Sequence, residues 1–162
     1  MAELTNLETK VAEVIGLAQA AQGATEKIEK LVDDGELKQQ LQKMRKEATE
    51  TEERTTQIAE SFDGKKTAIL EKARETKQEA TEMMQTYLGD DADGLDGFEF
   101  LTMAEAGEVG HWQVLGTMNQ RAGIGGIQEL VQWATPIQER HFQEAKQGSL
   151  KLAADEDPNE EA

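Results

Sequence analysis

The chain has 162 residues and no cysteine, and its 33 acidic residues outnumber the 17 basic ones, which gives a formal net charge of -16. This charge repels phosphate backbones and anionic lipid surfaces, so we expect no binding to nucleic acid. Without cysteine, disulfides, thiolate metal sites and cysteine nucleophiles are excluded. The N-terminus does not resemble a signal peptide and no stretch approaches the roughly 20 apolar residues of a membrane span, so we expect a cytoplasmic protein that does not contact membranes.

The composition is typical of long helices. Only 4% of the residues are aromatic and only 2 are proline, whereas residues that favour helices, such as Glu, Gln, Ala, Lys and Leu, are abundant. A chain of this length suits a single domain with a substantial core. We therefore predict an all-α domain in residues 1–152, followed by a disordered acidic tail in residues 153–162.

Apolar residues recur in steps of three and four along most of the chain, which is the period of an amphipathic helix. Thr5 and Glu8 have the spacing of a capping box, in which each side chain accepts a hydrogen bond from the backbone of the other residue. We expect the four long helices to form an antiparallel four-helix bundle, with an additional shorter third helix alongside. The pattern predicts helices near residues 5–32, 36–62, 65–88, 97–121 and 125–152.

The acidic stretch from Gly89 to Gly97 has the composition of a calcium-binding loop but not its spacing. Counted from Asp91, the positions at which an EF-hand needs an oxygen ligand and a glutamate hold Leu95 and Thr102. We therefore expect a loop that caps the following helix rather than a calcium site.

The inward-facing side of the fourth predicted helix becomes polar at Glu105 and Glu108, with His111 beside them. An ionised carboxylate in the core costs several kcal/mol unless it is paired, hydrogen-bonded or bound to a metal. Glu108 and His111 are three residues apart, and in the fifth helix Gln138 and His141 have the same spacing. A spacing of three residues places both side chains of a pair on one helix face. The two pairs contain both histidines of the chain, and so they are the best candidates for a functional site.

Glu108-x-x-His111 and Gln138-x-x-His141 resemble the metal motifs of the ferritin-like superfamily, whose bundles hold two metal ions through two Glu-x-x-His motifs and two further glutamates. Over roughly residues 5–150, the order of the helices is also similar to that of small bacterial stress-associated ferritin-like proteins of the YciE/YciF type. The resemblance implies a ferritin-like bundle with a role in stress or metal handling.

Carried over position by position, the resemblance makes Glu108, His111 and His141 candidate metal ligands. It adds Glu47, near the middle of the second helix, and Glu144, one turn beyond His141. Imidazole and carboxylate ligands suit iron, manganese or zinc. The implied cofactor is therefore a divalent transition metal held between the second, fourth and fifth helices.

Two acids of the family pattern are missing from this sequence. Gln138 stands where one glutamate is expected, and the first helix offers Gln19 and Gln22 at the matching level, with Glu13 the nearest acid. Because carboxylates bridge the two ions and balance their charge in di-iron sites, we expect an incomplete site and no complete oxidase chemistry.

Other interpretations of these residues remain open. Gln138 can be the capping partner of Thr135, if the helix restarts at Pro136. His111 and His141 can be ordinary, partly buried imidazoles. The alternative function is then a metal-free helical stress or interaction protein with a degenerate site.

The length and composition of the helices also bear on assembly. Helices of about 25 residues are roughly 37 Å long, and here their apolar faces are rich in alanine and threonine. Such faces leave one side of a monomer poorly packed. We therefore expect a homodimer, with Trp112 and Trp133 as core or interface residues.

Overall fold

The computed structural model describes residues 2–162, and α-helices hold 81% of the chain. No strand occurs within residues 2–162, so the predicted all-α class is confirmed, and the predicted helix bounds agree to within about three residues. None of the helices described is both long enough and apolar enough to cross a membrane. The helices are α1 (Asn6–Glu29), α2 (Gly35–Glu60), α3 (Lys66–Tyr87), α4 (Gly94–Ala122) and α5 (Gly125–Ala154).

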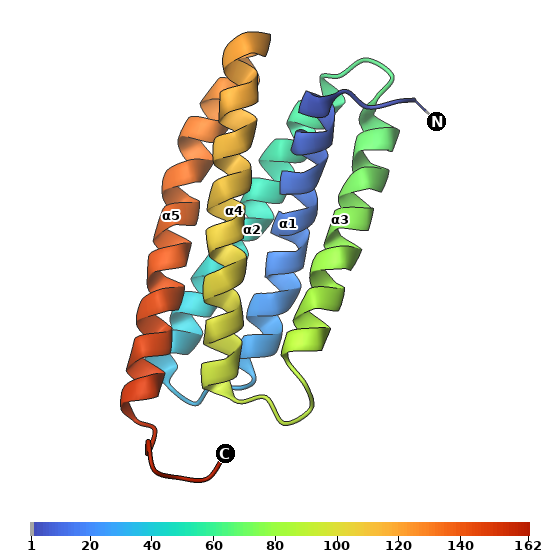
Figure 1. The fold of residues 1–162 in the computed structure, drawn as a ribbon. Helices are drawn as coiled ribbons and strands as arrows, with labels where there is room; N and C mark the ends of the chain where they lie inside the picture. The colour runs from blue at the N-terminus through green and yellow to red at the C-terminus, as the bar shows by residue number, and fades with distance from the viewer. Residues whose placement is uncertain (1) are drawn as a thin grey trace.

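The five helices lie side by side, and each runs antiparallel to the one before it in the chain (Figure 1). The helix α1 packs against α2, α3 and α4, whereas α5 packs against α2 and α4. The helix α3 packs mainly against α1 and runs parallel to it, on the side away from α5 (Figure 1). The helix α1 therefore connects α3 to the rest of the molecule.

Reciprocal caps fix the starts of two helices. The N–H of Glu8 donates to Thr5 Oγ1 at 3.2 Å, and the N–H of Thr5 donates to Glu8 Oε2 at 2.8 Å, as the spacing predicted. Asp93 and Asp96 cap α4 in the same way. A cap contributes about 1 kcal/mol to stability. The acidic loop before α4 is thus a capping loop, as expected from its sequence.

The helix α5 is continuous through Pro136, which lies in its interior. The possible restart at Thr135 was wrong, because α5 begins at Gly125 and the Thr135 hydroxyl has no hydrogen-bond partner. Packing against α4 and α2 outweighs the backbone hydrogen bond that a proline removes from a helix. Gln138 does not cap a helix, and its side-chain amide donates hydrogen bonds to α4 instead.

The interior contains two hydrophobic clusters, one toward each end of the helices. Trp112 belongs to one cluster, whereas Phe98 and Leu101 belong to the other. Between these positions on α4 lie Glu105 and Glu108, which are also buried. The core is therefore apolar at both ends and polar in the middle.

A glycine sets the distance between α1 and α3. A Cβ atom at Gly16 would collide with the carbonyl oxygen of Ala73 and would lie 2.7 Å from the Cβ of Thr76. Relieving this collision requires a shift of the α3 backbone, because the carbonyl group cannot rotate away within a helix. The close contact between α1 and α3 therefore depends on the missing side chain at Gly16.

Gly16→Ala should lower the free energy of unfolding by about 1–3 kcal/mol, as overpacking of a core does. Gly23→Ala is the matched control on the same helix, because a Cβ there meets no atom within 4 Å. Alanine is about 1 kcal/mol better than glycine in a helix, so this control should be as stable as the parent or more stable. Urea denaturation measures both, and equal stability of Gly16→Ala and the parent would contradict the prediction.

Candidate functional site

Five side chains from three helices form a polar layer between the two hydrophobic clusters. Three of them are almost fully buried, with at most 2% of their surface exposed, and Glu108 is 6% exposed. The side chains from α4 and α5 are at buried positions of these helices, and Glu47 is at the edge of the buried face of α2, next to Ala48. The members of the polar layer are Glu47, Glu105, Glu108, Gln138 and His141.

The amide of Gln138 joins the two carboxyl groups of α4. Its Nε2 donates to Oε2 of Glu108 at 2.5 Å and to Oε2 of Glu105 at 3.0 Å. An amide NH2 group carries two hydrogens, so it can serve both oxygens at once. A neutral donor thus lies between two acids, where a carboxylate-bridged site would hold a cation.

The imidazole of His141 lies between two carboxylates. Its Nδ1 is 3.7 Å from Oε2 of Glu105, and its Nε2 is 3.4 Å from Oε1 of Glu47. Burial by itself lowers the pKa of His141, but the contacts and charges of Glu105 and Glu47 outweigh burial and raise that pKa. The positively charged imidazolium is therefore favoured here.

Glu47 is held from the outer side by Arg140. The guanidinium donates through Nη1 to Oε1 of Glu47 at 3.0 Å and through Nη2 to Oε2. Burial acts to raise the pKa of Glu47, but Arg140 and His141 outweigh it and lower that pKa. Glu47 is thus an ionised carboxylate with a cationic group on each side.

Glu108 differs from Glu47 because it has no cationic partner. Burial raises the pKa of Glu108 well above the usual value, Glu105 raises it further, and the hydrogen bond from Gln138 offsets only part of this. Within residues 2–162, the one side chain that donates a hydrogen bond to Glu108 is Gln138. Glu108 is therefore the carboxyl group of the layer whose negative charge is not balanced.

His111 does not belong to the polar layer. Its side chain is 39% exposed, and its Nδ1 lies 3.4 Å from the carboxylate of Glu13 on α1. Lys10 also donates to Glu13, at 2.6 Å. Three residues are less than one helical turn, so His111 is rotated from Glu108 by about 60° around α4. The expected convergence of Glu108, His111 and His141 is therefore only partial.

Glu144 also lies apart from the polar layer. Its Oε1 is 3.7 Å from Nη1 of Arg140, one turn earlier on α5. Of the predicted ligands, only Glu47 and His141 contact each other directly. In the part of the chain that the structure describes, no group of three or more His, Asp or Glu side chains has the arrangement of a metal site.

Arg140 is a residue beside the polar layer that the sequence analysis missed. It lies next to His141 in the sequence but outside the apolar seam of α5, and it is partly exposed. Its long side chain reaches Glu47 on α2 across the surface of the core. No spacing within one helix predicts such a contact, because it depends on how α2 and α5 lie against each other.

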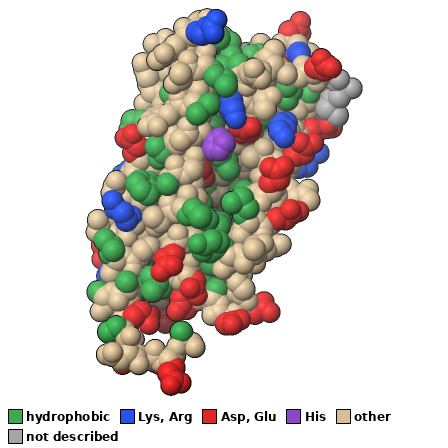
Figure 2. Space-filling view, viewed as in Figure 1, with side chains coloured by type: hydrophobic (Ala, Val, Ile, Leu, Met, Phe, Trp, Pro, Cys, Tyr) green, Lys and Arg blue, Asp and Glu red, His purple; other side chains and the backbone are tan. Residues whose placement is uncertain are grey.

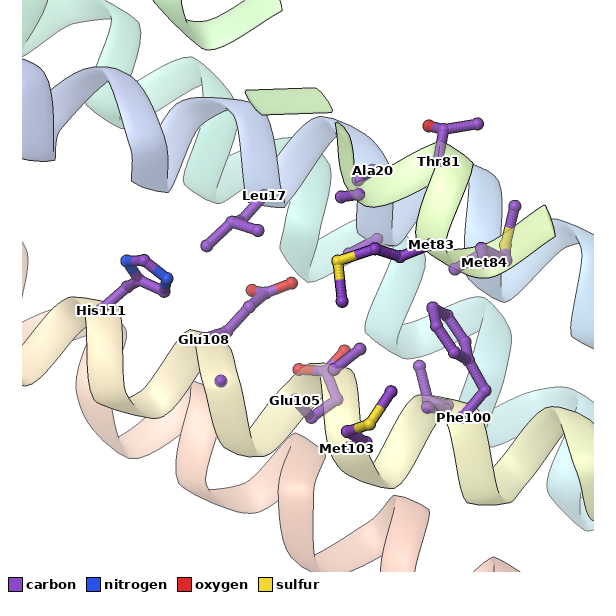
Figure 3. A pocket seen from close by; sticks show the side chains of 16 residues that line it. Leu17, Ala20, Thr81, Met83, Met84, Phe100, Met103, Glu105, Glu108 and His111 are labelled. Carbon is purple, nitrogen blue, oxygen red and sulfur yellow. The ribbon is translucent and has the colours of Figure 1, made fainter. Parts of the chain in front are cut away.

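An apolar cavity of about 210 Å³ opens beside the polar layer, between α1, α3 and α4. In Figure 3 the Glu108 carboxyl points from α4 into this cavity, between Leu17 of α1 and Met83 of α3. His111 lies at one end of the cavity and Phe100 at the other. Hydrophobic side chains gather on the face of the molecule that α1, α3 and α4 form, shown in Figure 2. The cavity therefore combines apolar walls with two buried acids, Glu105 and Glu108.

Comparisons with protein-family models, with curated proteins and with solved structures find no match for this chain. The resemblance to the ferritin-like superfamily therefore rests on the motif residues and on the order of the helices. A function has to be inferred from the polar layer and the cavity themselves.

Glu108→Gln should gain stability relative to the parent as the pH rises. The folded-state pKa of Glu108 lies above the ordinary value of 4.5, so Glu108 contributes most to stability below that value. This contribution is lost as the pH rises through the folded-state pKa, because the carboxyl group must then ionise in the core or the protein must unfold. A glutamine at position 108 does not titrate and avoids this loss.

Urea denaturation of the parent and Glu108→Gln between about pH 4 and pH 8 measures the effect. As the pH rises, the free energy of unfolding of Glu108→Gln should increase steadily relative to that of the parent. Glu99→Gln, which makes the same change at an exposed position of α4, is the matched control and should show no such trend. A constant difference for Glu108→Gln would mean that Glu108 ionises as an ordinary glutamate.

Proposed function

We propose that this chain is a ferritin-like antiparallel four-helix bundle that binds a small apolar molecule in the cavity beside its polar layer. In this proposal α1, α2, α4 and α5 form the bundle and α3 is the additional helix. The contacts of α1 with α2 and α4, and of α5 with the same two helices, support this arrangement. The position of the polar layer, midway along the helices, supports the ferritin-like relationship.

The hydrogen bonds within the polar layer support a binding protein better than a metal oxidase. The Gln138 amide lies between the two acids of α4, and Arg140 contacts both oxygens of Glu47. The hydrogen bonds of Gln138 and the positive charge of Arg140 thus take up carboxylate oxygens that metal ions bind in ferritin-like sites. The raised pKa of His141 also opposes metal binding, because a ligating nitrogen must lose its proton.

The position of Glu108 in the cavity is the observation that carries this proposal. Binding sites for small molecules are mostly apolar and contain a few convergent polar groups. A buried acid with a strongly raised pKa that faces a cleft is a further mark of a functional site. Here Leu17, Met83 and Phe100 supply apolar surface, and Glu108 supplies the polar group.

A neutral apolar probe, 1-octanol, should bind to the parent and shift the NMR signals of the Met83 and Met84 methyl groups. Gly107→Leu should weaken this binding at least about tenfold, since one methylene in an apolar pocket is worth 1–3 kcal/mol and leucine fills more than that. Gly107 lines the cavity, and a Cβ there meets no atom within 4 Å, so the fold accommodates the change.

Gly110→Leu is the matched control, because Gly110 has the same free space on α4 and does not line the cavity. Equal binding of 1-octanol by the parent and Gly107→Leu would contradict the proposal.

The homodimer predicted from the sequence remains a prediction. A second copy is the competing occupant of this surface, since Met83 and Met103 are 59% and 42% exposed. If light scattering shows that the parent is a dimer and that Gly107→Leu is a monomer, the occupant of this surface is a second copy rather than a small molecule.

A divalent transition metal is a second candidate, which the surroundings of His141 favour. Its Nε2 faces Glu47 at 3.4 Å, and Glu105 lies beside Nδ1. Histidines that bind metals are commonly oriented by a carboxylate on the other ring nitrogen. In this function Glu47 and His141 would hold iron, manganese or zinc, and Arg140 would have to release Glu47.

Elemental analysis of protein purified without a His-tag or chelator separates these two functions. If the cavity is the functional site, the parent should contain far less than one metal ion per chain, also after incubation with ferrous iron, manganese or zinc. Stoichiometric metal that disappears in a Glu47→Gln and His141→Ala double variant would make metal binding the better account. Glu50→Gln, an exposed acid of α2 that pairs with Arg54, is the control for nonspecific binding.

A further inference from the structure

We propose that the molecule bound in the cavity is an apolar amine, whose ammonium group pairs with the carboxylate of Glu108 while its hydrocarbon part fills the space between α1, α3 and α4. This inference rests on the proposed binding function and names the class of ligand for the same site. It follows from the balance of charges around Glu108 and from the walls of the cavity.

The charges of the polar layer leave one carboxylate without a partner. His141 lies between Glu105 and Glu47, and Arg140 holds Glu47 from the other side. These two cationic groups lie against Glu105, Glu47 and, through Arg140, Glu144, so neither of them is available to Glu108. Glu108 receives only a neutral amide hydrogen bond, which reaches its Oε2. Ionised Glu108 therefore lacks one positive charge.

The basic side chain that lines the cavity, His111, faces another acid. His111 faces Glu13 at 3.4 Å, and Lys10 donates to the same carboxylate. Among the described residues no lysine or arginine lines the cavity, and α3 contributes only alanine, methionine and Thr81 to its wall. A cation that balances Glu108 must therefore come from outside the chain.

An ammonium group suits this place better than other head groups. A hydrogen bond between an ammonium N–H and a carboxylate is about twice as strong as one between neutral groups. A carboxylate head group would instead be repelled by Glu105 and Glu108, and an alcohol would leave the missing charge unbalanced. The net charge of -16 also attracts cations to the molecule as a whole.

The walls of the cavity suit a hydrocarbon chain. Met83 and Met84 are flexible and polarisable, so they adapt to an apolar ligand, and Phe100 closes one end. A volume of about 210 Å³ corresponds to about seven water molecules at roughly 30 Å³ each, which is enough for a short alkyl chain. A second charged group on the ligand would lie against apolar surface and would be penalised.

Three probes with chains of the same length test the head group: octylamine, 1-octanol and octanoate. Calorimetry at pH 7 should show that octylamine binds to the parent at least about tenfold more tightly than 1-octanol, which corresponds to 1.4 kcal/mol. Octanoate should bind most weakly. Octylamine binding should release a proton and should tighten from about pH 5 to pH 8, because Glu108 has to ionise before it pairs with the ammonium group.

Glu108→Gln should reduce the affinity for octylamine at least about tenfold, to the level of 1-octanol, and should change the affinity for 1-octanol by no more than about threefold. It should also remove the pH dependence of octylamine binding. Glu99→Gln, exposed on the same helix, should leave all three affinities unchanged. Circular dichroism verifies that the variants fold, and the comparison of octylamine with 1-octanol on the parent provides the test if Glu108→Gln does not.

The possible outcomes separate this inference from the function on which it rests. If octylamine and 1-octanol bind equally well, with or without Glu108, the ammonium inference is overturned and the binding function stands. A preference for octanoate likewise overturns the inference alone. If none of the three probes binds to the folded parent, the proposed function itself is wrong.

Discussion

Two acids on one face of α4 share a single neutral amide in the middle of the core, and the other features of the site depend on this. Glu105 and Glu108 are buried, so each needs hydrogen bonds, positive charge or a proton in place of the water it loses. The Gln138 amide supplies hydrogen bonds to both but charge to neither. His141 supplies charge on the side of Glu105, which leaves Glu108 to be neutralised by a proton or by a ligand.

The carboxyl group without a cationic partner is accessible because of the way in which α3 packs on α1. Close contact at Gly16 holds the first half of α3 against α1, whereas the second half carries Met83 and Met84 past the side of α4. The space between α3 and α4 is not filled by side chains and forms the cavity. Tyr87 of α3 packs on Phe100 of α4, with ring centroids 5.8 Å apart, and the cavity that Glu108 reaches lies beside this contact.

Gln138 is one of the residues that make the chemistry of this layer differ from that of a metal centre with a full set of acids. A glutamate in place of Gln138 would add a third carboxylate beside Glu105 and Glu108, and such a group is stable only with a bound cation or with protons. The amide does not need an added cation, because it donates hydrogen bonds to both acids and adds no negative charge. Arg140 has the same effect on Glu47. Gln138 and Arg140 thus satisfy carboxylate oxygens of the layer, and Glu108 is the carboxyl group that they leave without a cationic partner.

The sequence alone determined the helices, their caps and the polar character of the middle of the core. These depend on local spacing, since apolar residues recur every three or four positions, Thr5 and Glu8 cap one helix, and Glu105 and Glu108 follow the inward face of another. Only the tertiary structure decided which polar groups meet. His111 meets Glu13 because α4 lies beside α1, and Arg140 reaches Glu47 because α5 lies beside α2. The cavity likewise depends on how α3 lies on α1, since pairing between helices involves residues far apart in the chain that no local pattern relates.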